Sequence, residues 1–101
     1  MVTSIKDNRL EIKIVEDITT PWVKDKLDQV RGVIDRDNSY EEIVVDMEKV
    51  EVIDSIGVNL IIALYKRASQ ISKSFKITGL NGKVKNLFNI LRLDEFLMVE
   101  S

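Results

Sequence analysis

The chain has 101 residues, of which 45% are apolar, enough to build one domain around one hydrophobic core. Charged residues make up 32%, but the formal net charge is only −2, which argues against an extended phosphate-binding surface and so against nucleic acid as a partner. The absence of Cys and His excludes disulfides, thiolate nucleophiles, zinc ribbons and imidazole bases.

The first predicted elements form a hairpin of two strands. Apolar and charged residues alternate over residues 9–15, which is the period of a strand with one buried face. Asp7 and Asn8 come just before this strand and tolerate the left-handed backbone of a tight turn. We therefore expect residues 3–6 to pair back as an edge strand.

A helix is predicted to begin near the only proline of the chain. Thr19 or Thr20 can cap its N-terminus, and Pro21 fits its first turn. One amphipathic stripe then follows, made of Val23, Leu27, Val30 and Ile34. Trp22 lies at the expected exposed start of this helix, where it either anchors a partner or covers the edge of the core.

The centre of the chain predicts a buried strand followed by a buried helix. The β-branched run at residues 43–45 ends in Asp46 and is typical of a central strand, parallel to its neighbours and covered on both faces. Val52 and Ile53 are expected to be buried. Residues 55–71 carry apolar side chains at helical spacing, which predicts a helix roughly 25 Å long.

The C-terminal part repeats the alternation of strand and helix. Residues 75–78 predict a strand closed by Gly79, and Asn81 opens a third helix. The apolar stripe of this helix consists of Val84, Leu87, Phe88 and Leu91. With a last short strand at residues 97–100, the pattern predicts an α/β fold, in which a mixed, mainly parallel sheet is packed with helices and residues 1–101 form one domain.

No segment of the sequence predicts membrane insertion. The longest uncharged run, residues 55–65, is much shorter than the ~18 to 20 residues needed to span a bilayer, and the N-terminus lacks a signal-peptide pattern. We therefore expect a cytoplasmic protein.

Motifs for catalysis and cofactor binding are sparse. Asp46 and Asp54 both follow strand-like segments, so a magnesium site resembling that of a phospho-receiver, or a small magnesium-dependent phosphotransferase, is one alternative. The four glycines form neither a P-loop nor a dinucleotide fingerprint, and the basic residues lack interleaved aromatics. We expect no enzyme activity, no metal and no cofactor.

The candidate functional site is the polar start of the second helix. Asp54 and Ser55 place an acid and a hydroxyl there, followed closely by Gly57. Both residue types are favoured where a helix begins, so capping alone explains them. A helix N-terminus also favours an anion, which gives this corner a possible second role.

The segment around this corner resembles the signature of STAS-domain anti-sigma-factor antagonists. The resemblance rests on residues 43–46, the connection to Ile53, and the run Asp54, Ser55, Ile56, Gly57 and Val58. It continues through residues 75–78, through Val84, Lys85, Leu87 and Phe88, and through Leu93, Asp94, Glu95 and Phe96. It covers nearly the whole chain and implies a single STAS-type domain with an N-terminal hairpin.

The resemblance implies a partner-switching role. In this family an unphosphorylated antagonist binds an anti-sigma-factor serine kinase, sigma factor is released, and phosphorylation of a serine inactivates the antagonist. That serine corresponds to Ser55, a serine phosphatase would restore binding, and ATP would be the ligand of the kinase. The expected partner-binding residues are Thr19, Thr20, Trp22, Asp54, Ser55, Ile56, Gly57, Val58 and Asn59. We expect Val58 and Asn59 to be at least half-exposed. We expect Gly57 to lie where a side chain would obstruct either the partner or the adjacent loop.

A second function remains open at this point. Ile56 stands where the family usually has Ser or Thr, and residues 17–20 read Asp-Ile-Thr-Thr where the family often has Gly-Glu-Leu-Asp. Both departures favour a STAS adaptor that is never phosphorylated. Such an adaptor would be a scaffold in a stress-signalling complex or a transporter-associated subunit.

Overall fold

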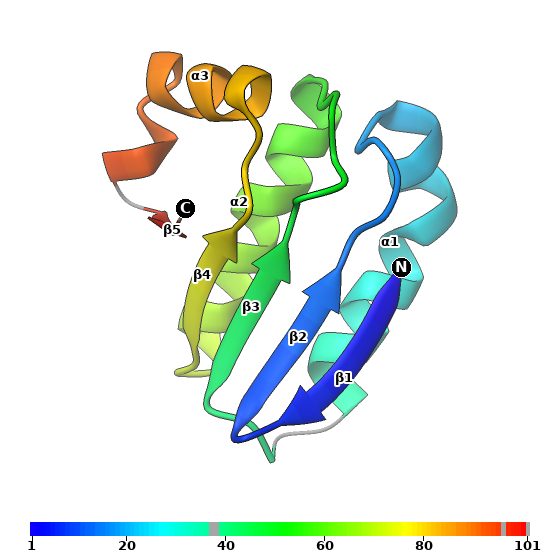
Figure 1. Cartoon of the computed structure of the whole chain (residues 1–101). Coiled ribbons are helices and arrows are strands. Elements are labelled where there is room, and N and C mark those ends of the chain that lie inside the picture. Colours follow the sequence, from blue (N-terminus) through cyan, green and yellow to red (C-terminus); the bar gives the residue numbers. More distant parts are fainter. Residues whose placement is uncertain (37–38, 96, 101) are drawn as a thin grey trace.

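The computed structural model describes residues 1–36, 39–95 and 97–100. Its five-stranded sheet has the order β1-β2-β3-β4-β5 (Figure 1). The strands are Val2–Lys6 (β1), Arg9–Lys13 (β2), Glu42–Asp46 (β3), Ser74–Thr78 (β4) and Met98–Glu100 (β5). β1 is antiparallel to β2, and every later pair of neighbours is parallel, which confirms the predicted mixed sheet.

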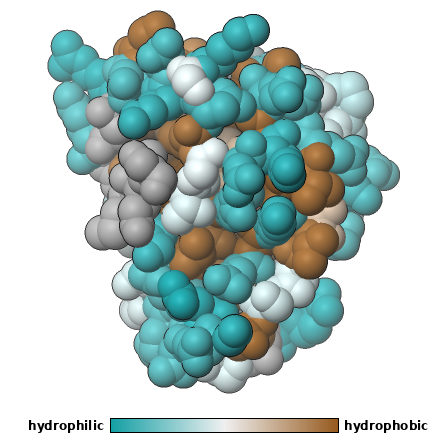
Figure 2. All heavy atoms as spheres, in the orientation of Figure 1, coloured by the Kyte–Doolittle hydropathy of each residue, from teal (hydrophilic) through white to brown (hydrophobic). Residues whose placement is uncertain are grey.

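The helices are Thr20–Arg36 (α1), Ser55–Gln70 (α2) and Gly82–Ile90 (α3), followed by the short 3-10 helix Leu93–Glu95. α1 and α2 cover one face of the sheet, whereas α3 lies beyond the upper end of β4 in Figure 1. α1 and α2 pack against each other behind the strands in Figure 1. The opposite face of the sheet, which is turned toward the viewer in Figure 2, is largely hydrophilic with scattered hydrophobic patches.

The N-terminal hairpin forms as the sequence predicts. Asp7 and Asn8 adopt φ angles of 53° and 64°, and the two strands pair in the register Lys6↔Arg9. Positive φ at both turn residues is typical of the two-residue turns that suit the twist of a hairpin. Asp and Asn tolerate this conformation better than most residues.

β3 is the central strand that its β-branched run predicts. It pairs in parallel with β2 on one side and with β4 on the other. Ile43 and Val45 are fully buried, and Val44, which points to the opposite face, is only 7% exposed. The predicted covering of both faces is only partly met, because none of the described helices packs on the face of Val44, which lies between Glu11 of β2 and Lys76 of β4 in the register.

The helix boundaries are close to those predicted. α1 begins at Thr20 with Pro21 in its first turn, and α3 has Asn81 as its N-cap. α2 ends at Gln70, one residue before its predicted end, and Ile71 becomes its C-cap.

Two apolar residues expected in the core lie at the surface. Val52 is 51% exposed, because Ile53 beside it pairs with the neighbouring loop and turns inward, so the extended backbone points Val52 outward. Leu91 is 47% exposed, because α3 ends at Ile90 and the helical stripe does not continue. Residues 37 and 38, and Phe96 at the end of the family pattern, lie outside the described residues.

Candidate functional site

Two loops meet at the edge of the sheet where β2 and β3 end. Ile18, which precedes α1, and Ile53, which precedes α2, form an isolated parallel bridge. The Ile18 N–H donates to the Val52 carbonyl at 3.0 Å, and the Asp54 N–H donates to the Ile18 carbonyl at 3.3 Å. These bonds hold the N-termini of α1 and α2 next to each other.

Asp54 caps both helices. It is the N-cap of α2, where its Oδ1 accepts the N–H of Gly57 at 2.8 Å. Its Oδ2 accepts the N–H and the hydroxyl of Thr20, the first residue of α1, at 2.7 and 2.9 Å. The first N–H groups of a helix have no partner within the helix, so one carboxylate satisfies donors at two helix ends.

These hydrogen bonds keep Asp54 ionised. The bond from the Gly57 N–H lowers the pKa of Asp54 below its ordinary value, and partial desolvation opposes this change. The bonds from Thr20 and the Ile56 N–H also lower the pKa, so the net direction is downward. Asp54 therefore carries its negative charge at the positive ends of two helix dipoles at neutral pH.

Gly57 permits the close approach of α2 to the bridged loops. A Cβ at this position would lie 2.1 Å from the Ile18 carbonyl oxygen and 2.8 Å from Cγ1 of Ile53. The Ile18 oxygen belongs to the bridge between the loops and cannot move without disrupting it. The sequence left open whether a side chain at position 57 would obstruct the partner or the adjacent loop, and in the structure it would obstruct the adjacent loop.

Ser55 has the opposite character to Asp54. It is the first residue of α2 and its side chain is exposed. Within the described part of the chain its hydroxyl has no hydrogen-bond partner. Ile56 is 41% exposed, and Asn59, one turn further along α2, is exposed as expected. The corner thus combines a fully engaged carboxylate with an accessible hydroxyl.

A family model described as "Mlab, STAS domain" matches residues 1–100. The chain belongs to the STAS domain family. The resemblance that residues 43–58 carry in the sequence is confirmed at the level of the family. No curated protein matches the chain in sequence.

Solved structures show the same STAS fold at low identity. An anti-sigma-factor antagonist (STAS) domain protein from Planctomyces limnophilus has a TM-score of 0.87 at 13% identity, over 99% of this chain and 88% of that one. A protein of Thermotoga maritima described as an anti-sigma factor antagonist has a TM-score of 0.82 at 17% identity, over 99% and 85%. A sulfate transporter family protein from Wolinella succinogenes has a TM-score of 0.80 at 16% identity, over 96% and 80%.

The exposed part of this STAS corner is smaller than the sequence predicts. Trp22 and Val58 are each only 7% exposed, and Gly57 is buried as well. Trp22 lies eight residues before Val30 on one face of α1, and Val58 lies three residues before Ile61 on the buried face of α2. The expected exposure of Val58 is therefore wrong, and of the two roles left open for Trp22 the structure shows the one at the edge of the core.

One residue that supports the STAS corner was not singled out from the sequence. Oδ1 of Asp17 accepts the N–H groups of Glu51 and Val52, both at 3.0 Å. Asp17 thereby fixes the loop that leads to Asp54. Nothing in the local sequence marks this role, because donor and acceptor lie 34 and 35 residues apart.

The magnesium alternative gains no support from the STAS structure. Oδ1 of Asp46 accepts the N–H of Glu48 at 2.9 Å, and the Asp54 carboxylate is occupied by the two helix ends. Among residues 1–36, 39–95 and 97–100, no group of three or more Asp, Glu, His or Cys side chains is placed to hold a metal ion. In the same residues no helix combines the length and apolarity that crossing a membrane requires.

Proposed function

We propose that this STAS domain is an anti-sigma-factor antagonist, which binds an anti-sigma-factor serine kinase and is switched off when that kinase phosphorylates Ser55. The observation that carries the proposal is the division of roles at the start of α2. Asp54 is committed to two helix ends, whereas the adjacent Ser55 hydroxyl is exposed and unbonded within the described residues. Ser55 is thus accessible for modification without loss of a structural contact.

A phosphate on Ser55 would change the surface more than the fold. It adds roughly −1.5 to −2 charges beside the ionised Asp54. The N-terminal N–H groups and dipole of α2 favour an anion here, which offsets part of the repulsion within the free domain. A partner surface shaped for a neutral hydroxyl would meet this charge at a cost of several kcal/mol, and ~1.4 kcal/mol already changes affinity tenfold.

The surface around Ser55 also offers apolar contact to a partner. Ile56 and Val52 are 41% and 51% exposed, and Thr19 and Thr20 beside them are partly exposed. Exposed apolar side chains next to accessible hydroxyls suit a protein interface, in which apolar contacts give affinity and polar contacts give specificity. The proposed docking face therefore consists of Thr19, Thr20, Val52, Ser55, Ile56 and Asn59.

Intact-mass measurement tests this proposal directly. The protein is incubated with ATP and an anti-sigma-factor serine kinase encoded in the same genome, and one added phosphate is expected. Ser55→Ala should remain unmodified, whereas Ser69→Ala, which removes an exposed serine at the far end of α2, should still gain the phosphate. A serine phosphatase should then restore the original mass and kinase binding. An unmodified mass for the unaltered protein would contradict the switch.

The exposure of Ile56 and Val52 also favours a second candidate function. A permanent adaptor needs an apolar contact that no modification interrupts, and these two side chains provide one beside Ser55. Such a domain would act as a scaffold or as a transporter-associated subunit. The adaptor would bind its partner equally well before and after treatment with kinase and ATP. The antagonist would lose partner binding after the same treatment. Both candidates are binding modules without enzyme activity, and the antagonist would act in the cytoplasm with its kinase and the sigma factor.

A further inference from the structure

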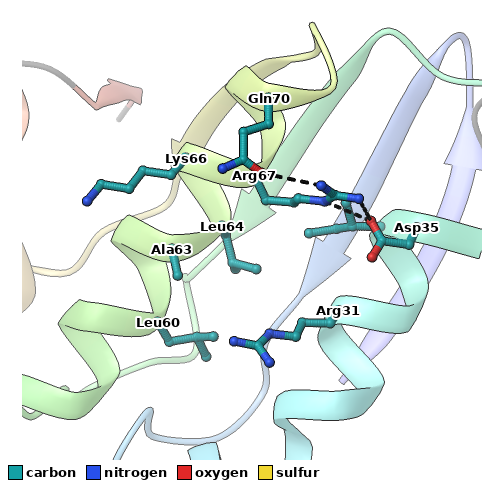
Figure 3. A pocket seen from close by; sticks show the side chains of 9 residues that line it. Arg31, Asp35, Leu60, Ala63, Leu64, Lys66, Arg67 and Gln70 are labelled. Atoms are coloured by element: carbon teal, nitrogen blue, oxygen red, sulfur yellow. Dashed lines mark hydrogen bonds and ion pairs between the residues drawn. The ribbon is translucent and has the colours of Figure 1, made fainter.

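A groove lies between the C-terminal halves of α1 and α2 (Figure 3). Its volume is about 340 Å³, which falls within the range of roughly 300 to 1,000 Å³ typical of small-molecule sites. α1 and α2 each connect two parallel strands, so they run in the same direction, and Ser55 lies at their other end. The groove is therefore separate from the proposed docking face.

The floor of the groove is apolar. Leu60 and Leu64 of α2 and Ile34 of α1 line it, and their side chains are 4%, 3% and 1% exposed. Ala63 is too small to fill the space above them, which leaves the groove open to solvent. An apolar part of a ligand would therefore contact mainly the exposed Ala63 and the outermost atoms of Leu60 and Leu64.

The rim of the groove is positively charged, although the chain as a whole carries a net charge of −2. Three cations, Arg31, Lys66 and Arg67, line it together with a single acid, Asp35. Nη2 and Nε of Arg67 both lie 3.0 Å from Oδ1 of Asp35, and its Nη1 donates to Gln70 at 3.3 Å. Asp35 is thus already neutralised by Arg67.

Arg31 is the cation available to a ligand. Figure 3 shows its guanidinium reaching from α1 toward Leu60, whereas Lys66 extends away from the groove. Arg31 has no ion pair within the described residues. The negative end of a helix dipole acts only within the last turn, and Arg31 lies before the last turn of α1. An interaction with the helix dipole therefore does not explain why an arginine stands at this position.

We propose that the groove binds a small organic anion, with its apolar part against Ala63 and the outer atoms of Leu60 and Leu64, and its phosphate or carboxylate group on Arg31. The guanidinium pairs well with both kinds of oxyanion and can do so in a bidentate manner. The apolar floor excludes simple inorganic anions as good ligands, and the charged rim disfavours neutral ones. The volume accommodates a ligand of modest size, which favours a small molecule over an acidic segment of a protein.

Amide chemical-shift titration with phenyl phosphate as the probe tests this proposal. The expected result is a saturable shift confined to residues 31–35 and 60–70. Inorganic phosphate and phenol, which represent the charged and apolar halves of the probe, should each bind at least about tenfold more weakly, the equivalent of ~1.4 kcal/mol. Absence of saturable shifts would overturn the proposal, as would saturation by an acidic hexapeptide but not by phenyl phosphate.

Matched variants locate the binding in the groove. Arg31→Gln should weaken phenyl phosphate binding by about tenfold. Lys85→Gln, which makes the same charge change at an exposed position on α3, should leave it unchanged. Because Arg31 is exposed, the unfolding midpoint of Arg31→Gln should match that of the unaltered protein. Equal binding by the two variants would show that the anion binds elsewhere. None of these measurements involves a kinase, so their outcome is independent of the proposed switch.

Discussion

Asp54 accepts both the backbone N–H and the hydroxyl of Thr20, which lies 34 residues earlier in the chain, at 2.7 and 2.9 Å. The same carboxylate accepts the N–H of Gly57 within its own helix. One side chain therefore links the first turns of α1 and α2. In this STAS domain the aspartate of the signature holds two helix ends together by hydrogen bonds, and the side chain of the serine beside it is exposed.

Removal of the Asp54 carboxylate is expected to destabilise the domain. Asp54→Ala leaves N–H donors at two helix ends without their acceptor, whereas Thr20→Val removes one hydrogen bond only. The loss of stability should therefore be larger for Asp54→Ala than for Thr20→Val, as measured by urea unfolding at pH 7. Asp28→Ala, at an exposed position on α1, serves as the control and should have almost no effect. An Asp54→Ala variant as stable as Asp28→Ala would show that the linkage contributes nothing.

The Asp54 linkage should weaken in acid. The hydrogen bond from Gly57, assisted by those from Thr20 and Ile56, lowers the pKa of Asp54 in the folded state. Protonation is then easier in the unfolded chain, so the contribution of Asp54 is complete above its unfolded pKa of about 3.9 and is lost as the pH falls through the lower folded value. The stability difference between the unaltered protein and Asp54→Asn should be constant between about pH 5 and 7 and should shrink below about pH 4. Urea unfolding across this range measures it, and a difference independent of pH would contradict the assignment.

Substitution of the signature glycine should be severe. Gly57→Ala places a Cβ 2.1 Å from the Ile18 carbonyl oxygen, so α2 must move away from the bridged loops. We expect a loss of about 3 kcal/mol in unfolding free energy, the upper end of the usual cost of overpacking. Gly32→Ala is the matched control, because its new Cβ meets nothing closer than 3.8 Å, and it should stabilise the helix by roughly 0.4 to 1 kcal/mol. Equal effects of the two substitutions would refute the role of close packing.

Acidic substitution of Ser55 should separate binding from folding. Ser55→Asp and Ser55→Glu place a carboxylate at an exposed helix start, so the thermal unfolding profile should stay nearly unchanged. Binding to the kinase, measured by calorimetry, should be lost, whereas Ser55→Ala should bind and resist inactivation by ATP. Gln29→Glu adds one negative charge at an exposed position on α1 and should bind normally. Normal kinase binding by the acidic Ser55 variants would exclude the switch.

Much of the fold could be predicted because it depends on local patterns. The alternation over residues 9–15, the Asp7 and Asn8 turn and the β-branched run at residues 43–45 each specify an element through neighbours in the sequence, and all three elements are present. The Asp54 and Ser55 corner could be predicted on the same basis, since a helix start has its own residue preferences. The wrong expectations concern single side chains, since Val58 is buried and Val52 and Leu91 are exposed.

The sequence by itself determined the order of strands and helices, the mixed sheet and the position of the polar corner, because local periodicity and capping preferences encode them. Only the tertiary structure decided what each residue of the corner does. The parallel crossovers bring the loops after β2 and β3 to one edge of the sheet, where Asp54 meets Thr20 and Gly57 meets Ile18. Contacts between residues more than thirty positions apart depend on this packing, so no local pattern could have revealed them.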